Sequence, residues 1–153
     1  MREPKLEHIM SYNGLLAPPE VIGPLAEGLR INFYVTGGTV TGPRLSGKVR
    51  PVGADWLTLR RDGIAVLDVR ATLELAGGAL VYVTYGGFID LGETGYDDFQ
   101  RGVMPPSGIA IRTQPRMHTA HPDYLWLNRL YCVGIGQAYL DRQEVEYDVF
   151  AIR

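Results

Sequence analysis

The feature that most constrains the fold is a long alternation of apolar and polar residues in the middle of the chain. From Ala65 to Leu75 every second residue is apolar, and most of the residues between them are polar. A period of two is that of a β-strand with one buried face. Gly77 and Gly78 follow, and a second alternating segment runs from Ala79 to Ile89. The pattern predicts two long antiparallel strands joined by a tight turn.

Other segments show a shorter alternation or an apolar run between turn residues. They predict strands over residues 6–16, 30–36, 42–50, 56–61, 109–117, 130–139 and 144–152. The 19 glycines and 10 prolines lie mostly between these segments. Three prolines between Leu15 and Glu27 exclude a helix there. Only residues 94–103 and 121–129 are candidates for a turn of helix.

The length of 153 residues fits one domain. A single domain with about eight to ten antiparallel strands has to close into a barrel or stack as a sandwich, because open strand edges invite association. The two long strands over residues 64–75 and 79–89 favour the barrel. We therefore predict an all-β fold, a closed antiparallel β-barrel that occupies residues 1–153.

Charge and cysteine content narrow the possible partners. The chain has 15 basic and 17 acidic residues and a net charge of −2, unlike the basic surface of a nucleic-acid-binding protein. It contains no apolar run of roughly 18 residues, the length that spans a membrane. No apolar segment follows Met1–Lys5, so we expect no signal peptide and a cytoplasmic protein. Cys132 is the only cysteine, which excludes an internal disulfide and a cysteine-based zinc cluster.

No cofactor motif is present. His118 and His121 are three residues apart, but they lie at a predicted strand end and lack a third metal ligand. The glycine pairs in Thr36–Thr39 and at Gly86–Gly87 lack the strand–loop–helix context of a nucleotide-binding loop. We expect no metal and no cofactor.

The polar residues of the longest alternating strand form the first group of candidate site residues. Asp68, Arg70, Thr72 and Glu74 share one face. If that face is outside, it is a solvated surface. If it lines the barrel, Asp68 is a candidate base or orienting group, and Arg70 a candidate holder of a substrate carboxylate or enolate. If Leu67, Val69 and Leu73 line the lumen instead, this group drops out of the site.

Four residues near predicted turns form a second group of candidates. Asp55 and Trp56 follow a turn at Gly53–Ala54 and are candidates for substrate binding. Tyr34 offers a phenol donor for the same purpose. Tyr85 precedes Gly86–Gly87, where a ligand can approach the backbone closely, and is a candidate proton donor.

A third group lies in the second half of the chain. Arg112 and Arg116 flank a strand break at Pro115 and are candidates for binding an anionic substrate group. His118 lies on the same face as Arg116 and titrates near neutrality, which makes it a candidate general acid or base. Trp126 and Asn128 share a side if their segment is extended, and they complete the predicted binding group.

The chain resembles the DUF3237 (UPF0311) family in motifs that follow the family order over nearly the whole sequence. The matching segments are Arg30–Phe33, Thr36–Gly47, Gly53–Trp56, Arg60–Gly63, Asp68–Arg70, Gly77–Gly87, Thr113–Arg116, Tyr124–Asn128 and Val145–Phe150. The resemblance implies a closed antiparallel barrel similar in outline to the calycin, dirigent and allene oxide cyclase barrels. It implies no substrate. One departure is His118, where members of the family usually have glutamate, so a mechanism that uses a carboxylate there is in doubt.

Three possibilities remain in view. A barrel of this size holds one small ligand. The first function is that of a cofactor-independent isomerase, cyclase or lyase that acts by acid–base chemistry on a small hydrophobic or aromatic metabolite. The alternative is a lipocalin-like binding protein without turnover. A barrel filled by its own side chains would instead serve self-association, and the apolar tail Tyr147–Ile152 suggests a homodimer or a higher homo-oligomer.

Overall fold

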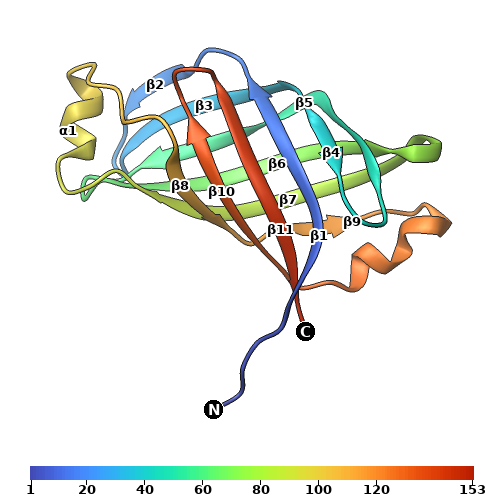
Figure 1. The fold of residues 1–153 in the computed structure, drawn as a ribbon. Coiled ribbons are helices and arrows are strands. Elements are labelled where there is room, and N and C mark those ends of the chain that lie inside the picture. The colour runs from blue at the N-terminus through green and yellow to red at the C-terminus, as the bar shows by residue number, and fades with distance from the viewer.

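The two long alternating segments form the paired strands predicted for them. In the computed structural model, which describes residues 1–153 (Figure 1), β6 (Ile64–Leu75) pairs antiparallel with β7 (Ala79–Asp90) along its whole length. A short 3₁₀ turn, η1 (Ala76–Gly78), joins them. Gly77 and Gly78 have φ values of 80° and 78°, in the left-handed region that favours glycine.

The other elements lie close to the predicted segments. The further strands are β1 (Leu6–Leu16), β2 (Glu20–Pro24), β3 (Leu29–Gly37), β4 (Thr39–Thr41), β5 (Ser46–Leu59), β8 (Ile109–Thr113), β9 (Arg116–His118), β10 (Cys132–Tyr139) and β11 (Glu144–Ile152). The helical elements are α1 (Gly95–Gln100) and the 3₁₀ helix η2 (Pro122–Arg129), within the two segments predicted for a helical turn.

Three differences from the predicted strands have local causes. The two strands predicted over 42–50 and 56–61 are one strand, β5, which passes its proline at a change of register between Val49 and Gly53. The strand predicted over 109–117 is two strands, β8 and β9, separated at Pro115, and both pair with β7. The short strands β2 and β4 carry too few residues to show an alternation.

The sheet closes on itself, as predicted. The strand order runs from β11 through β10, β8, β7, β6 and β5 to β3 and β1, and β1 pairs with β11 from Leu6 to Leu15. The result is a closed antiparallel barrel of 8 strands. In Figure 1 the β6–β7 hairpin projects at one end, and β2 and α1 lie at the other. Full closure leaves the main strands without a free edge.

The charged face of β6 points outward, so the expectation that Asp68 and Arg70 line the lumen is wrong. Their side chains are 57% and 50% exposed, and they form an ion pair at 3.4 Å on the outer surface. Leu67 and Val69 face the interior and are 4% exposed. The apolar side chains occupy the interior because burial removes their surface from water, whereas an outward ion pair remains solvated.

The two halves of the barrel differ in how completely side chains fill the lumen. Met10, Val81, Val83, Leu127 and Val149 fill the half nearer the β6–β7 hairpin, and each is at most 2% exposed. The other half, toward α1, contains a cavity. The lumen is thus filled at one end of the barrel and hollow at the other.

The apolar tail does not form a free edge. Tyr147, Val149 and Ala151 are buried, and β11 pairs with β1 on one side and β10 on the other. The tail is therefore part of the barrel wall and core. No helix of the structure has the length and apolar character needed to cross a membrane.

Candidate functional site

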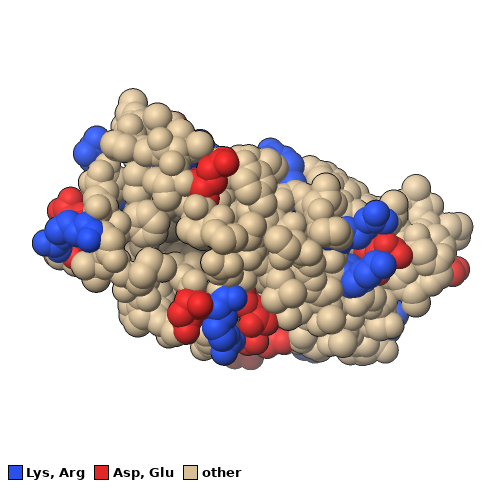
Figure 2. Space-filling view, turned by 90° about the horizontal axis from the view of Figure 1, so that it is seen from above, with Lys and Arg blue, Asp and Glu red and all other residues tan.

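An apolar cavity occupies the half of the barrel near α1. Of the 25 residues that line it, 22 are hydrophobic. Most come from the strands, and the others are Leu91 and Leu140 just after β7 and β10, Phe99 of α1 and Pro105 of the following loop. Its volume, taken over the positions open to the centre of a water molecule, is about 80 Å³. The surface seen in Figure 2 is hollowed toward this end, and most side chains around the hollow are uncharged. The site therefore suits a small, largely apolar ligand.

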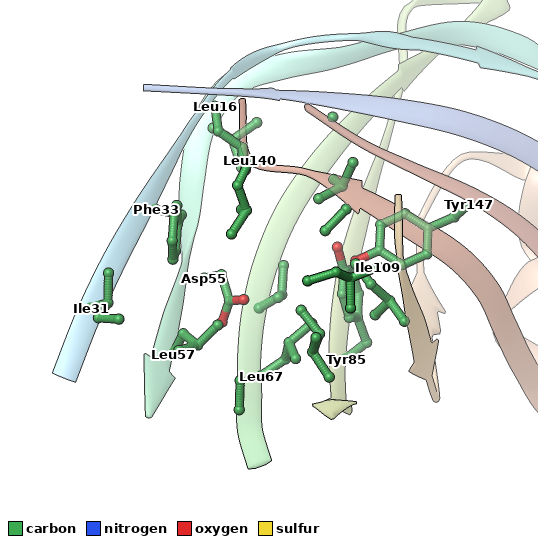
Figure 3. A pocket seen from close by; sticks show the side chains of 18 of the residues that line it. Leu16, Ile31, Phe33, Asp55, Leu57, Leu67, Tyr85, Ile109, Leu140 and Tyr147 are labelled. Atoms are coloured by element: carbon green, nitrogen blue, oxygen red, sulfur yellow. The ribbon is translucent and has the colours of Figure 1, made fainter. Parts of the chain in front are cut away.

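Asp55 provides the only carboxyl group in the cavity lining. It lies on β5 between its register partners Phe33 and Val69, and it points into the cavity (Figure 3). The backbone N–H of Asp68 donates a hydrogen bond to Asp55 Oδ1 at 3.0 Å. The side chain is half-buried, and the part that remains exposed faces the cavity.

The environment of Asp55 changes its proton affinity. Burial among apolar side chains raises the pKa of the carboxyl from 3.8 to about 7. The Asp68 N–H and the charge of Arg30 oppose that rise, and the negative charge of Asp68 adds to it. Both the acid and the carboxylate form of Asp55 are therefore populated near neutral pH.

Three tyrosines form a cluster in the same cavity. Tyr12 of β1, Tyr85 of β7 and Tyr147 of β11 bring their rings together, with centroids 4.9 Å apart for Tyr12 and Tyr147 and 5.6 Å apart for Tyr85 and Tyr147. Burial raises the phenol pKa of all three well above 10. The cluster therefore consists of neutral hydrogen-bond donors that face an apolar space.

The carboxyl group and the phenols meet at this cavity from different parts of the wall. Figure 3 shows Asp55 and Tyr147 on opposite sides of the space, with Leu67 and Tyr85 below them. The cavity thus has a carboxyl group on one side and phenol hydroxyls on the other. This arrangement can orient a substrate oxygen and transfer a proton.

The structure brings two of the sequence-predicted site residues into the cavity, Asp55 and Tyr85. The other nine lie on the outer surface. Seven of them are exposed, namely Tyr34, Asp68, Arg70, Arg112, Arg116, His118 and Asn128. Trp56 and Trp126 are half-buried beneath arginines, with Arg70 5.4 Å from the Trp56 ring centroid and Arg44 4.0 Å from that of Trp126. Such stacking on an outer wall is cation–π packing, not ligand binding in the lumen.

The expectation that His118 serves as an acid or base in the lumen is not met by its position. His118 lies on the exposed face of β9, opposite Tyr82 of β7. Met117, its neighbour, fills the interior position. The departure from the family pattern at His118 therefore falls on the outer surface and leaves the cavity unchanged.

Two residues of the candidate site lay outside the sequence-based predictions, Tyr12 and Tyr147. Each occupies an inward position in an alternating segment, where tyrosine is also a common strand residue. The signal that identifies them is their pairing, because Tyr12 is the register partner of Tyr147 where β1 closes the barrel on β11. That pairing requires knowledge of the closure.

A second polar group lies on the outer surface. Ser11 donates a hydrogen bond to Asp148, and His8 Nε2 lies 3.0 Å from Ser11 Oγ. In a hydrolytic triad the histidine stands between the serine and the carboxylate and takes the serine proton. Here the serine stands between the other two and donates its hydrogen bond to Asp148, so the group lacks the geometry of an activated nucleophile.

Comparisons with known proteins identify relatives over most of the chain. The family model "Protein of unknown function (DUF3237)" matches residues 4–152. A UPF0311 protein of Rhodopseudomonas palustris is 34% identical over 126 residues, 81% of this chain and 82% of its own length. A UPF0311 protein of Bradyrhizobium diazoefficiens is 35% identical over 142 residues, 92% of each chain.

Solved structures share the barrel. A Rhodopseudomonas palustris protein of unknown function has a TM-score of 0.87 and 27% identity, with both chains covered over 100% of their length. A beta-barrel like protein of Acinetobacter baumannii has a TM-score of 0.81 and 28% identity over 100% of this chain and 98% of its own. A structure described as an enzyme from Penicillium herquei, with a TM-score of 0.71 and 21% identity over 100% and 97%, shares the fold. The chain belongs to the DUF3237 (UPF0311) family, as its motifs predicted.

Proposed function

We propose that the chain is a cofactor-independent isomerase, cyclase or lyase that transfers protons between Asp55 and a small hydrophobic or aromatic metabolite in the barrel lumen. The observation that carries this proposal is a lone carboxyl group in an apolar cavity, with a pKa raised to about 7 by burial. A general acid or base works best when its pKa lies near the working pH. A site that only binds an apolar ligand has no need of such a group.

The chemistry requires one proton and no other reagent. Protonated Asp55 gives its proton to a carbon or oxygen of the substrate, and the resulting carboxylate takes a proton from another position. The substrate then has the same atoms in a new arrangement, or has lost a neutral fragment, and Asp55 returns to its starting form. The apolar lining keeps water from the charged intermediate, which strengthens every electrostatic interaction around it.

The tyrosine cluster supplies the second function that such a reaction needs. Neutral phenols of Tyr12, Tyr85 and Tyr147 can donate hydrogen bonds to a carbonyl or hydroxyl oxygen on which negative charge develops. Because desolvation already disfavours the phenolate, these hydroxyls hold their protons at neutral pH. We therefore expect a substrate with an apolar body, often a ring, and at least one oxygen.

The second candidate function is a lipocalin-like carrier. One observation favours it: hydrophobic residues make up 22 of the 25 positions in the lining, and the phenols are neutral donors. In that case Asp55 is only a hydrogen-bond partner, and its protonation tunes affinity.

Solvent deuterium exchange separates the two functions. A panel of small phenols, aryl ketones and enones is incubated in D₂O with the protein, and NMR detects deuterium uptake, conversion and binding. The enzyme is expected to label or convert at least one compound, and Asp55→Asn to slow this by about 100-fold or more. Asp97→Asn, which changes an exposed carboxyl on α1, is the matched control and should react as the natural protein does.

The outcome distinguishes catalysis from binding. Conversion that survives Asp55→Asn would contradict the role given to this residue. Binding of panel compounds without deuterium uptake or conversion, in both the natural protein and the variant, would support the carrier.

A further inference from the structure

The β5–β6 ladder has an opening beside Asp55. The pairs Asp55–Val69 and Thr58–Val66 are formed and share one register. Between them, neither Trp56 and Asp68 nor Leu57 and Leu67 are paired in this ladder. The neighbouring ladders β3–β5 and β6–β7 are continuous at the same residues. The interruption is therefore confined to two consecutive positions of the β5–β6 ladder, and no residue is inserted there.

Both backbone groups freed by the opening bond to side chains. The N–H of Asp68 donates to Asp55 Oδ1 at 3.0 Å. The carbonyl of Trp56 accepts a hydrogen bond from Arg30 Nη1 at 2.7 Å. In a regular antiparallel pair these two groups would bond to each other. Each side chain thus takes the place of one half of a missing ladder bond, and neither backbone group is left without a partner.

We propose that Arg30 is a positioning residue for Asp55, an inference that rests on the function proposed above. By holding the Trp56 carbonyl, the guanidinium keeps the ladder open and leaves the Asp68 N–H free to donate to the Asp55 carboxyl. Arg30 lies on the outer face of β3 and is half-buried, so it acts through the wall without contacting a ligand. If Arg30 is absent, the Trp56 carbonyl and the Asp68 N–H are free to bond to each other, and Asp55 loses its donor.

The groups that face Asp55 fix the sign of the effect. On the cavity side it meets only the neutral phenols of Tyr85 and Tyr147 among titratable groups. On the outer side are Arg30 of β3 and the Asp68–Arg70 ion pair of β6. Loss of the Asp68 donor and of the Arg30 charge both disfavour the carboxylate. Removal of Arg30 therefore raises the midpoint of Asp55 titration.

Two variants separate the hydrogen bond that Arg30 donates to the Trp56 carbonyl from the effect of its charge. Arg30→Met removes both the charge and the donor, whereas Arg30→Gln removes the charge and keeps an N–H donor for the Trp56 carbonyl. Arg50→Met is the matched control, because Arg50 lies on the outer face of β5 and pairs with Glu74, away from the opening.

The experiment is an NMR titration of the Asp55 carboxyl carbon and the Asp68 amide proton, without substrate. In the natural protein the Asp68 amide should follow the Asp55 midpoint, and Asp55→Asn should abolish that dependence. Arg30→Met should raise the Asp55 midpoint by about one pH unit and uncouple the Asp68 amide from it. Arg30→Gln should raise the midpoint less and keep the coupling, and Arg50→Met should change neither.

Several outcomes would overturn the proposal. These are an Asp68 amide that does not follow Asp55 in the natural protein, an unchanged midpoint in Arg30→Met, and identical behaviour of Arg30→Met and Arg30→Gln. The first of these needs no Arg30 variant, so the test survives a folding failure. Because no substrate is used, the result is independent of the deuterium experiment, and failure of the proposed function leaves the positioning role standing or falling by itself.

Discussion

At the scale of single residues, Asp55 makes the stability of the barrel depend on pH in an unusual direction. Its pKa is about 7 in the folded chain and near 3.8 when exposed, so between these values the folded state binds more protons than the unfolded state. Stability from this group is complete below about pH 4 and is lost as the pH rises through 7. The loss is at most about 4 kcal/mol, from three pH units at about 1.4 kcal/mol each.

Urea unfolding of the natural protein and Asp55→Asn tests this sign. The stability of the natural protein relative to the variant should fall between pH 4 and pH 7 and then level off, because all other titrating groups are common to both. Curves that stay parallel across this range would show that Asp55 ionises normally in the barrel.

The sequence identified some residues of the site and not others for a physical reason. Asp55 and Tyr85 were predicted as site residues because glycines next to them indicate an irregular or accessible backbone. Both side chains line the cavity. Asp68 was predicted as a site residue because it pairs with Arg70. Hydrophobic burial, however, decides which face of β6 points inward, and that face carries the leucines. Tyr12 and Tyr147 become a pair only through contacts between the two ends of the chain.

At the scale of elements, Gly53 gives β5 the shape that carries Asp55. Its φ is 95°, and a Cβ there would lie 2.1 Å from the carbonyl oxygen of Arg70 on β6. Gly53→Ala should therefore cost about 2–3 kcal/mol through strain and backbone displacement, and it should disturb Asp55 two residues further on.

Gly77→Ala is the matched control for this prediction. Gly77 has a φ of 80°, but nothing lies within 4 Å of its added Cβ. Gly77→Ala should therefore lower the free energy of unfolding only through conformational strain, by about 1 kcal/mol. Equal losses of unfolding free energy in the two variants would show that the close approach at Gly53 is unimportant.

Strand prediction succeeded where side chains alternate over many residues and failed where backbone geometry decides. β1, β6, β7 and β11 lie within a residue or two of the predicted ranges. The length of β5 depends on how the chain passes Pro51 at a change of register, which local alternation does not show. β4 exists because β1 and β5 offer partners to a three-residue segment.

At the scale of the whole molecule, closure followed from the number of strands, but the cavity did not. A closed barrel has no free strand edges, and the number of strands predicted from the sequence already indicates that the sheet must close. Whether the lumen is filled depends on the summed volumes of inward side chains from strands that are far apart in the chain. Side chains fill the lumen near the β6–β7 hairpin, and the other half stays partly empty.

Substitution of two neighbouring valines tests this difference in packing between the two halves of the barrel. Val69 of β6 lines the cavity, and Val83 of β7 lies in the packed half, although they are 4% and 2% exposed. Val83→Ala should cost about 2 kcal/mol, because it leaves a new void among packed neighbours. Val69→Ala should cost about half as much, since part of the valine surface already faces empty space.

Denaturant unfolding measures both free energies, and the binding of panel compounds gives a second readout. Val69→Ala widens the lumen and should admit larger ring systems, whereas Val83→Ala should leave the binding preference unchanged. Equal destabilisation with unchanged binding in both variants would mean that the lumen near α1 is as densely packed in solution as the opposite half. A ligand site there would then require the barrel to open. The Asp55 carboxyl would be surrounded by protein atoms alone, with no space beside it for a substrate.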